Sequence, residues 1–201
     1  MIAAIVLAAG ESSRMGSPKA LLPIGGKPFI ERIVSVLAAS KIGKVFVVLG
    51  HNAAEMEPKI DHLPVTIVIN KDYAKGQLSS LIAAIRSLKE ENIGERVDGV
   101  LVHLVDHPFL SLTLVNHMID QFYESKKLIV IPRYKGRRGH PVIFSSQLFA
   151  ELLKAPLDQG AKAVVRAHRD ETLEIEAEDE GVVVDIDTPE EYRERVLSKI
   201  P

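Results

Sequence analysis

The residues after the first apolar run of the chain are of the types that bind anions. The segment combines small residues and serine hydroxyl groups with one guanidinium and one ammonium group. Glycines let the backbone approach a ligand closely, and the N–H groups of such a loop form a concave anion site. The two cationic groups would add charge, so that a polyphosphate could be held by dipoles and charges together. The residues concerned are Leu7, Ala8, Ala9, Gly10, Ser12, Ser13, Arg14, Gly16 and Lys19.

Spacing separates this loop from two common phosphate loops. The dinucleotide fingerprint G-x-G-x-x-G is absent, because five residues stand between Gly10 and Gly16. A Walker A loop needs glycine, lysine and serine or threonine in series, whereas Ser17 and Pro18 separate Gly16 from Lys19. The segment is therefore either a third kind of phosphate loop or a polar turn with incidental charges.

Aspartates at the ends of two predicted strands could hold a divalent cation. Asp106 follows a strand predicted over residues 97–105 and precedes a proline. Asp185 and Asp187 alternate along a strand predicted over residues 182–187, so they should point to the same face. Because Mg²⁺ prefers a few carboxylate oxygens together with waters and phosphates, we expect Asp106 and Asp187 to bind it, with Asp185 as a further candidate. A turn-forming role is the alternative for Asp106.

A second polar segment opens a helix predicted over residues 78–89. Backbone N–H groups at a helix start and nearby hydroxyls can bind a phosphate, a ribose or a base edge, although ordinary capping by a serine explains the same residues. The candidate nucleotide-binding residues of this segment are Asn70, Gly76, Gln77, Ser79 and Ser80.

A basic loop is predicted over residues 133–140. It contains Arg137, Arg138 and His140, a combination that suits a second, phosphate-bearing substrate. A solvated basic turn is the alternative. The histidines elsewhere, such as His51 and His103, show no metal-ligand spacing, and we assign them no role.

The elements predicted from the apolar pattern would bring these residues to one edge of a sheet. Apolar runs indicate strands at residues 2–7, 44–49, 65–69, 97–105, 128–132, 141–144, 173–177 and 182–187. Helical spacing of apolar residues indicates helices between most of them, and a last helix starts at Pro189 with Thr188 as its N-cap and Glu191 closing a capping box. This alternation predicts an α/β fold, a Rossmann-like three-layer sandwich with a mostly parallel, mixed central sheet in a single domain over residues 1–201. Ligands of such sheets bind beyond the carboxyl ends of the strands.

Composition excludes several classes of protein. Of the 201 residues, 46% are hydrophobic, and 25 basic against 27 acidic residues leave a net charge of −2, so no basic field favours nucleic acid. Cysteine is absent, which excludes disulfides and thiolate sites. The first ten residues lack the basic start of a signal peptide, and no apolar run is long enough for a membrane helix. We expect a cytoplasmic protein without a membrane or nucleic-acid partner.

The segment from Leu7 to Leu21 resembles the nucleotidyltransferase pattern L-A-(A/G)-G-x-S-x-R-M-G-x-x-K-x-L at every fixed position. The chain is thereby similar to the MobA-like NTP transferase family. It most resembles the molybdenum cofactor cytidylyltransferase (MocA-type) branch, because Ala9 stands where the guanylyl branch usually has glycine. Further segments that agree with the family are Asn70 with residues 76–81, Asp106-x-Pro108, residues 139–141, residues 158–161 and residues 185–189.

The resemblance implies an Mg²⁺-dependent transfer of CMP from CTP to the phosphate of molybdopterin, with release of pyrophosphate. It implies that Arg14 and Lys19 hold the triphosphate and act with Asp106 in catalysis, and that Asp106 and Asp187 hold Mg²⁺. The basic loop would meet the acceptor, and a molybdoenzyme maturation chaperone is a further expected partner. The alternatives are another NTP, a sugar phosphate or other phosphate acceptor, a nucleotide-binding regulator or chaperone without turnover, and a dinucleotide oxidoreductase, which the missing fingerprint disfavours.

Overall fold

A computed structural model describes residues 1–90 and 97–199, and in this part of the chain eight strands form one mixed sheet. The strand order is β10-β7-β9-β6-β1-β4-β5, with β8 paired to β7 at the side. Neighbours are parallel except for β9, which runs antiparallel to both β6 and β7, and β8, which runs antiparallel to β7. The strands are β1 (Ile2–Leu7), β4 (Lys44–Leu49), β5 (Thr66–Ile69), β6 (Gly99–Leu104), β7 (Ile129–Tyr134), β8 (Arg137–Arg138), β9 (Val142–Ser145) and β10 (Thr172–Glu176); β2 (Pro23–Ile24) and β3 (Lys27–Pro28) form a separate hairpin.

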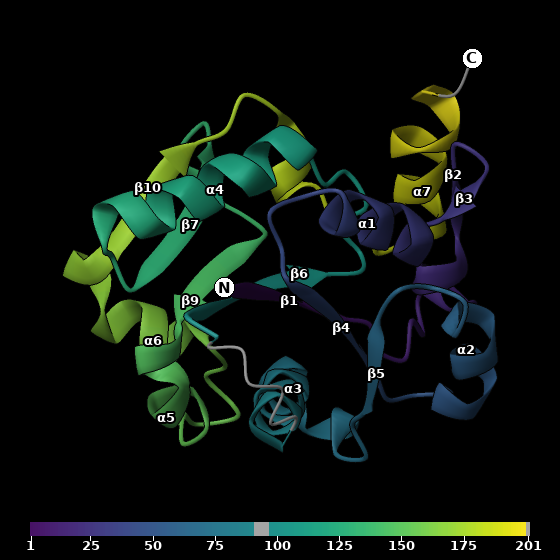
Figure 1. Cartoon of the computed structure of the whole chain (residues 1–201). Helices are drawn as coiled ribbons and strands as arrows, with labels where there is room; N and C mark the ends of the chain where they lie inside the picture. Colours follow the sequence, from purple (N-terminus) through teal and green to yellow (C-terminus); the bar gives the residue numbers. More distant parts are fainter. Residues whose placement is uncertain (91–96, 200–201) are drawn as a thin grey trace.

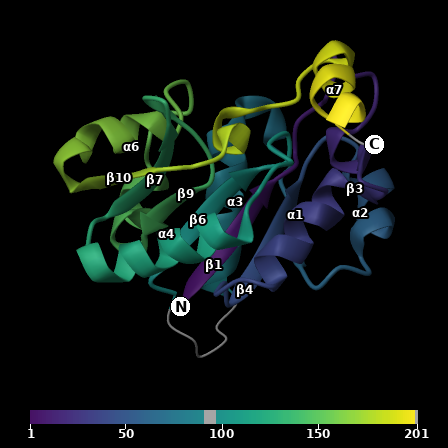
Figure 2. The same ribbon diagram turned by 90° about the horizontal axis from the view of Figure 1, so that it is seen from above.

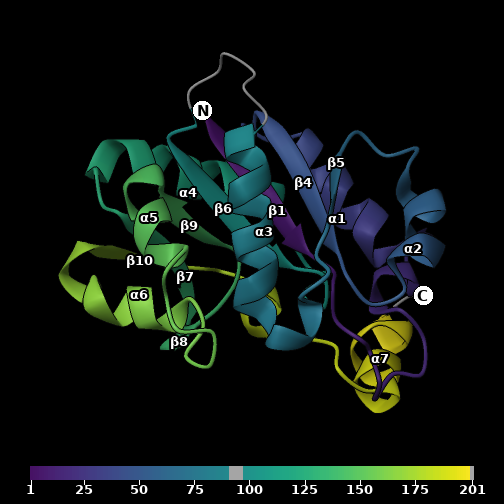
Figure 3. The same cartoon turned by 90° about the horizontal axis from the view of Figure 1, so that it is seen from below.

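Helices cover both faces of this sheet, as Figure 1 shows. In the view of Figure 2, α1 and α4 lie over one face, and in Figure 3, α3, α5 and α6 lie over the other. The helices are α1 (Phe29–Ala38), α2 (Ala53–Ile60), α3 (Gln77–Glu90), α4 (Leu112–Ser125), α5 (Phe149–Leu152), α6 (Lys162–Ala167) and α7 (Pro189–Arg195). Within the described residues, none of these helices is long and apolar enough to cross a membrane.

The central strand β1 shows why the sheet needs helices on both sides. Ile2, Ala4 and Val6 belong to the core under α1 and α4, whereas Ala3, Ile5 and Leu7 belong to the core under α3, α5 and α6. Successive side chains of a strand point to opposite faces, so an uninterrupted apolar strand is stable only when both faces are covered. The predicted α/β fold with a mostly parallel, mixed sheet in three layers is confirmed, while the extent of the single domain over residues 1–201 stays a prediction.

The last predicted strand, residues 182–187, is absent. The chain forms a short 3₁₀ turn, η5 (Glu180–Val183), and then crosses the carboxyl end of the sheet without joining it. His140 N donates to Val182 O at 2.8 Å, and Ile186 N donates to Asp106 O at 2.8 Å. These two bonds fix the segment across the strand ends, so its apolar residues pack at that edge rather than along a strand.

The basic loop predicted over residues 133–140 is largely a hairpin. β7 continues to Tyr134, and β8 pairs back on it. The turn between them, Lys135-Gly136, has φ values of 47° and 82°, which suit a two-residue hairpin turn. Arg137 and Arg138 therefore project from a strand, and their directions are set by pairing.

Candidate active site

A cavity of about 460 Å³ lies beyond the carboxyl ends of β1, β4 and β6, and we call it the first cavity. Such ends are where open α/β sheets bind ligands. The predicted loop forms one wall, and Asp106 lies next to Lys19 of this loop. Its lining includes Leu7, Ala8, Ala9, Gly10, Ser12, Ser13, Lys19, Gly76, Gln77, Ser80 and Asp106.

Ser12 gives the loop its shape. Its φ of 53° is left-handed, which costs energy in any residue other than glycine. Its carbonyl accepts from Met15 N at 2.9 Å and Gly16 N at 3.2 Å, and its hydroxyl accepts from Lys19 N at 3.2 Å. The side chain of Ser12 thus ties the start of the loop to the backbone of the lysine at its end.

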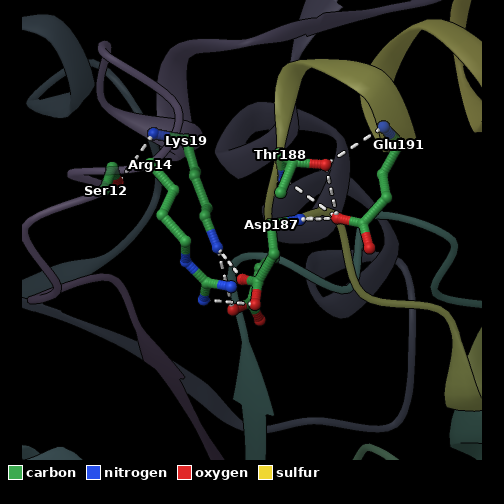
Figure 4. A network of polar contacts seen from close by, with 7 residues as sticks. Ser12, Arg14, Lys19, Asp187, Thr188 and Glu191 are labelled. Atoms are coloured by element: carbon green, nitrogen blue, oxygen red, sulfur yellow. Dashed lines mark hydrogen bonds and ion pairs between the residues drawn. The ribbon is translucent and has the colours of Figure 1, made fainter.

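Four charged side chains meet at the edge of the loop, as shown in part in Figure 4. Lys19 Nζ forms an ion pair with Asp187 and lies 3.5 Å from Asp106 Oδ2. Arg14 Nη2 lies 2.5 Å from Asp187 Oδ2. The structure therefore brings together four of the five residues that the sequence assigned to the triphosphate and the metal, although 168 positions separate Lys19 from Asp187.

The start of α7 holds Asp187 in place. Thr188 Oγ1 accepts from Glu191 N at 3.2 Å, and the Glu191 carboxylate accepts from Asp187 N at 2.8 Å and Thr188 N at 2.9 Å, so the predicted capping box is confirmed. The hydrogen bond and charge of Lys19, followed by those of Arg14, hold the pKa of Asp187 below its ordinary value. Asp187 is therefore a positioned carboxylate that stays ionised.

Two observations bear on the prediction that these carboxylates bind a hard divalent cation. Asp106 Oδ1 is buried and has no hydrogen-bond partner, so one carboxylate oxygen is free for a cation. Among the described residues, however, no three acidic or imidazole groups are placed to hold a metal ion. The strand expected to align Asp185 with Asp187 does not form, and a role of Asp185 as a metal ligand stays a prediction.

Asn70 and Ser79 lie behind the first cavity and do not line it. Asn70 Nδ2 donates to Ser79 Oγ at 2.9 Å and to Ser80 Oγ at 3.0 Å, and Asn70 Oδ1 accepts from Asp72 N at 2.9 Å. These bonds join the end of β5 to the first turn of α3. Asn70 and Ser79 therefore support the segment that presents Gly76, Gln77 and Ser80 to the cavity.

The residues predicted to meet the acceptor have separate environments. Arg138 Nε donates to Glu174 Oε1 at 2.8 Å, and its Nη2 bonds the same carboxylate. His140 is buried, and burial above all, with the charges of His107 and Lys162, lowers its pKa to about 4. His140 is therefore a neutral imidazole near neutral pH, and it carries no charge for a phosphate.

A second cavity of about 530 Å³ adjoins the first, since Leu7, Gln77 and Leu104 line both. His140, Arg138 and Gly139 form part of its wall. The remaining wall comes largely from α3, β9, α6 and the segment that leads into α6. A donor and an acceptor could thus meet at the shared edge.

Several lining residues of the first cavity were missed from the sequence, and three of them follow β4 and β5. His51, Asn52 and Tyr73 line it, and His51 Nδ1 lies 3.4 Å from Tyr73 Oη. Gly50, at the end of β4, permits this arrangement, because a Cβ there would lie 2.5 Å from Tyr73 Cβ. The position of these residues in the sequence could have indicated them. Gly50-His51-Asn52 directly follows a strand predicted to be parallel, and ligands bind at the carboxyl ends of such strands.

Curated proteins of similar length match nearly the whole chain. It is 30% identical to nicotine blue oxidoreductase from Paenarthrobacter nicotinovorans, covering 96% of this chain and 95% of that protein. It is 31% identical to the purine catabolism protein PucB from Bacillus subtilis, with coverages of 94% and 92%. The molybdenum cofactor cytidylyltransferase of Escherichia coli is 26% identical, also with coverages of 94% and 92%, so the predicted branch is not singled out.

Solved structures and a family model agree with these matches. The crystal structure of Rv0371c from Mycobacterium tuberculosis H37Rv superposes with a TM-score of 0.82 at 29% identity, covering 98% of this chain and 97% of the other. The model of the MobA-like NTP transferase domain matches residues 4–172, which include the loop, Asp106 and the second cavity. The chain belongs to the MobA-like NTP transferase family.

Proposed function

We propose that the protein transfers a nucleoside monophosphate from an NTP to a phosphate-bearing small molecule and releases pyrophosphate. The observation that carries this proposal is the meeting of Arg14 and Lys19 with Asp106 and Asp187 at the rim of a glycine- and serine-rich loop. This meeting supports a site in which the cations would hold a triphosphate and the carboxylates its metal, and the cavity that adjoins the first one offers room for an acceptor.

The donor would occupy the first cavity. The loop backbone from Ala8 to Gly10, with the hydroxyl of Ser13, would face the phosphates, while Gln77 and Ser80 on α3 would face the nucleoside. In the structure, Lys19 and Arg14 hold the Asp187 carboxylate, itself an anion. A triphosphate oxygen is the same kind of partner, so a bound triphosphate could take over these contacts; Lys19 lines the first cavity, and Arg14 lies beside it on Asp187.

Charge balance supports a metal ion at this site. Lys19 and Arg14 are matched in number by Asp106 and Asp187, so the four groups have no net charge to offset a triphosphate. Asp106 and Asp187 are the residues that would hold Mg²⁺. When bound, Mg²⁺ would neutralise charge on the triphosphate and on the leaving pyrophosphate.

The reaction needs positioning more than covalent help. An acceptor phosphate oxygen, held at the edge that the two cavities share, would attack the α-phosphorus of the donor in line with the leaving pyrophosphate. The bond between the α-phosphorus and the bridging oxygen breaks as the new phosphorus–oxygen bond forms. Lys19 and Arg14 would stabilise the charge that develops on pyrophosphate.

For the finer assignment we propose CTP as donor and molybdopterin as acceptor. Ala9 in the loop and the match to the cytidylyltransferase of Escherichia coli support this choice. A sugar phosphate or another small phosphate ester is the alternative acceptor, and a regulator or chaperone without turnover is the alternative role. A regulator would not need the paired carboxylates, which favours the enzyme.

The test measures pyrophosphate release with Mg²⁺, each NTP and a panel of acceptors that includes molybdopterin and sugar phosphates. Lys19→Met and Asp106→Asn should each lower turnover by roughly 10²–10³-fold with an unchanged circular dichroism spectrum. Lys126→Met, on the exposed end of α4, is the matched control and should retain activity. Turnover with UTP and a sugar phosphate alone would replace the finer assignment. Absence of pyrophosphate with every pair would refute nucleotidyl transfer.

The name of one relative favours a second candidate, an oxidoreductase. Nicotine blue oxidoreductase is 30% identical over nearly the whole chain. Incubation with NADH or NADPH and nicotine blue, followed by absorbance, separates the two candidates. We expect no oxidation of the dinucleotide; oxidation without any pyrophosphate release in the first assay would favour the oxidoreductase.

A further inference from the structure

Two cationic side chains of α6 line the second cavity without an acidic partner. Lys162 and Arg166 are both exposed, and within residues 1–90 and 97–199 no ion pair or side-chain hydrogen bond engages either of them. Residues four apart on a helix share a face, so one ligand can reach both groups. Asp158 is the single acidic residue among the described lining of this cavity.

The other basic residues of the region are less able to bind a ligand. Arg138 is engaged by Glu174 through two nitrogens, and His140 is neutral. Arg137 does not line the second cavity. The free positive charge of this cavity therefore comes from α6, which the sequence did not single out.

The remainder of the second cavity is suited to an apolar ring. Its wall includes Leu78, Leu81, Ile131, Phe144 and Val165, and it opens toward the first cavity at Leu7, Gln77 and Leu104. An apolar wall with two free cations at one side favours a flat, ring-bearing ligand with one strongly anionic group.

We propose that Lys162 and Arg166 bind the phosphate of the acceptor, and that the acceptor is a phosphate ester of a ring compound. That the bound molecule is an acceptor rests on the proposed function. The phosphate site itself is defined by the second cavity and by the charges of Lys162 and Arg166. Lys162 would act as a compact charge, and Arg166 would offer a bidentate fork to the phosphate oxygens. Neither residue belongs to the donor site.

A labelling experiment tests the site without turnover. Pyridoxal 5′-phosphate is a planar ring with one phosphate and an aldehyde, and the aldehyde forms an imine with a lysine nitrogen, releasing water. Borohydride then reduces the imine, and peptide mass spectrometry quantifies the label on each lysine. CTP and Mg²⁺ are added to protect Lys19. The aldehyde and the phosphate arm are on neighbouring ring carbons, so a phosphate held by Arg166 leaves the aldehyde within reach of Lys162. We expect Lys162 to be labelled in clear excess over the exposed Lys126.

A matched pair of variants shows whether the phosphate site directs the label. Arg166→Gln should lower labelling of Lys162 by about tenfold, the effect of losing about 1.4 kcal/mol of affinity for the probe. Arg137→Gln, which removes a neighbouring exposed cation outside the cavity, should leave it unchanged. Labelling of Lys162 no greater than that of Lys126, or equal labelling in both variants, would overturn the proposal.

Kinetics provide the second readout once an acceptor is identified. Lys162→Gln and Arg166→Gln should raise KM for the acceptor about tenfold each, with KM for the NTP unchanged, and Lys162→Arg should restore most of the loss. Unchanged acceptor KM in both glutamine variants would refute the assignment. If labelling succeeds and no NTP is consumed with any acceptor, the proposed function fails while the phosphate site stands.

Discussion

The ion pair between Lys19 and Asp187 should contribute to stability by an amount that a double-mutant cycle can measure. The cycle compares the wild type with Lys19→Met, Asp187→Asn and the double variant. Side-chain exposures of 11% for Lys19 and 23% for Asp187 show that solvent screens the pair only in part. A hydrogen bond to a charged group contributes roughly 1.5–3 kcal/mol, and partial screening reduces that to a coupling free energy of about 1–2 kcal/mol.

The pH dependence of this coupling has a defined sign. Hydrogen bonding from Lys19 is the first cause that lowers the pKa of Asp187 from its ordinary value of 3.8. A carboxyl group whose folded pKa is depressed stabilises the fold above its unfolded pKa and loses that contribution as the pH falls through the folded pKa. The coupling should therefore be full at neutral pH and decline in acid below 3.8.

Urea unfolding followed by circular dichroism provides the four free energies at each pH. A second cycle on Lys41 and Asp120, whose side chains are 54% and 44% exposed, is the control and should show less than about 1 kcal/mol of coupling. Additive effects of Lys19→Met and Asp187→Asn at neutral pH would refute the reasoning. A coupling that persists unchanged at the acid limit of folding would refute the assigned role of the carboxylate charge.

Three further predictions concern stability and are measured by urea unfolding. Gly139→Ala should destabilise the protein by about 1–3 kcal/mol, because its Cβ would meet a backbone carbonyl oxygen at 2.0 Å, whereas Gly10→Ala, with open space around it, should change little. Thr188→Ala should cost about 1 kcal/mol by removing the cap of α7, and Thr188→Ser should retain it. Burial lowers the pKa of His103 to about 3 and that of His140 to about 4, so only the unfolded chain gains these protons below pH 6.5. As the pH falls, the free energy of unfolding should then decrease by up to about 1.4 kcal/mol per pH unit for each imidazole. His103→Leu should remove the contribution of His103 to this dependence.

Each of these has a contrary outcome. Equal losses in Gly139→Ala and Gly10→Ala would show that the close approach at Gly139 does not limit packing. Equal stability of the alanine and serine variants at Thr188 would leave no energetic role for the cap. A slope in His103→Leu as steep as in the wild type would show that His103 titrates in the folded protein.

Local signals were sufficient for most of the fold. The continuous apolar residues of β1 and β4 predicted strands covered on both sides, and these strands form the centre of the sheet. The capping box of Thr188 and Glu191 was also predictable, because its partners are three residues apart. The loop from Leu7 to Leu21 stood out by its pattern alone. In each case the signal that allowed the prediction lies within a short stretch of the sequence.

The charged contacts between distant segments were decided by the tertiary structure. The sequence by itself supplied Lys19, Asp106 and Asp187 as candidates, but only the crossing of the segment before α7 over the strand ends brings Asp187 to Lys19. The ion pairs of Lys19 and Arg14 in this site are with Asp106 and Asp187. The spacing of apolar residues indicates which side chains are buried. It does not indicate the path of a segment such as residues 182–187, which buries most of its apolar side chains without pairing to the sheet.

Arg138 and Lys162 show the same division at the second cavity. Both are ordinary basic residues in the sequence, and a motif drew attention to Arg138. In the structure, pairing of β8 and β10 on the two sides of β7 brings Glu174 to Arg138, while Lys162 faces the second cavity without a partner among the described residues. Residue type and local pattern determined which groups could bind a phosphate; the arrangement of β10 and α6 decided which of them lie beside an acidic side chain, because that depends on the packing of segments far apart in the sequence.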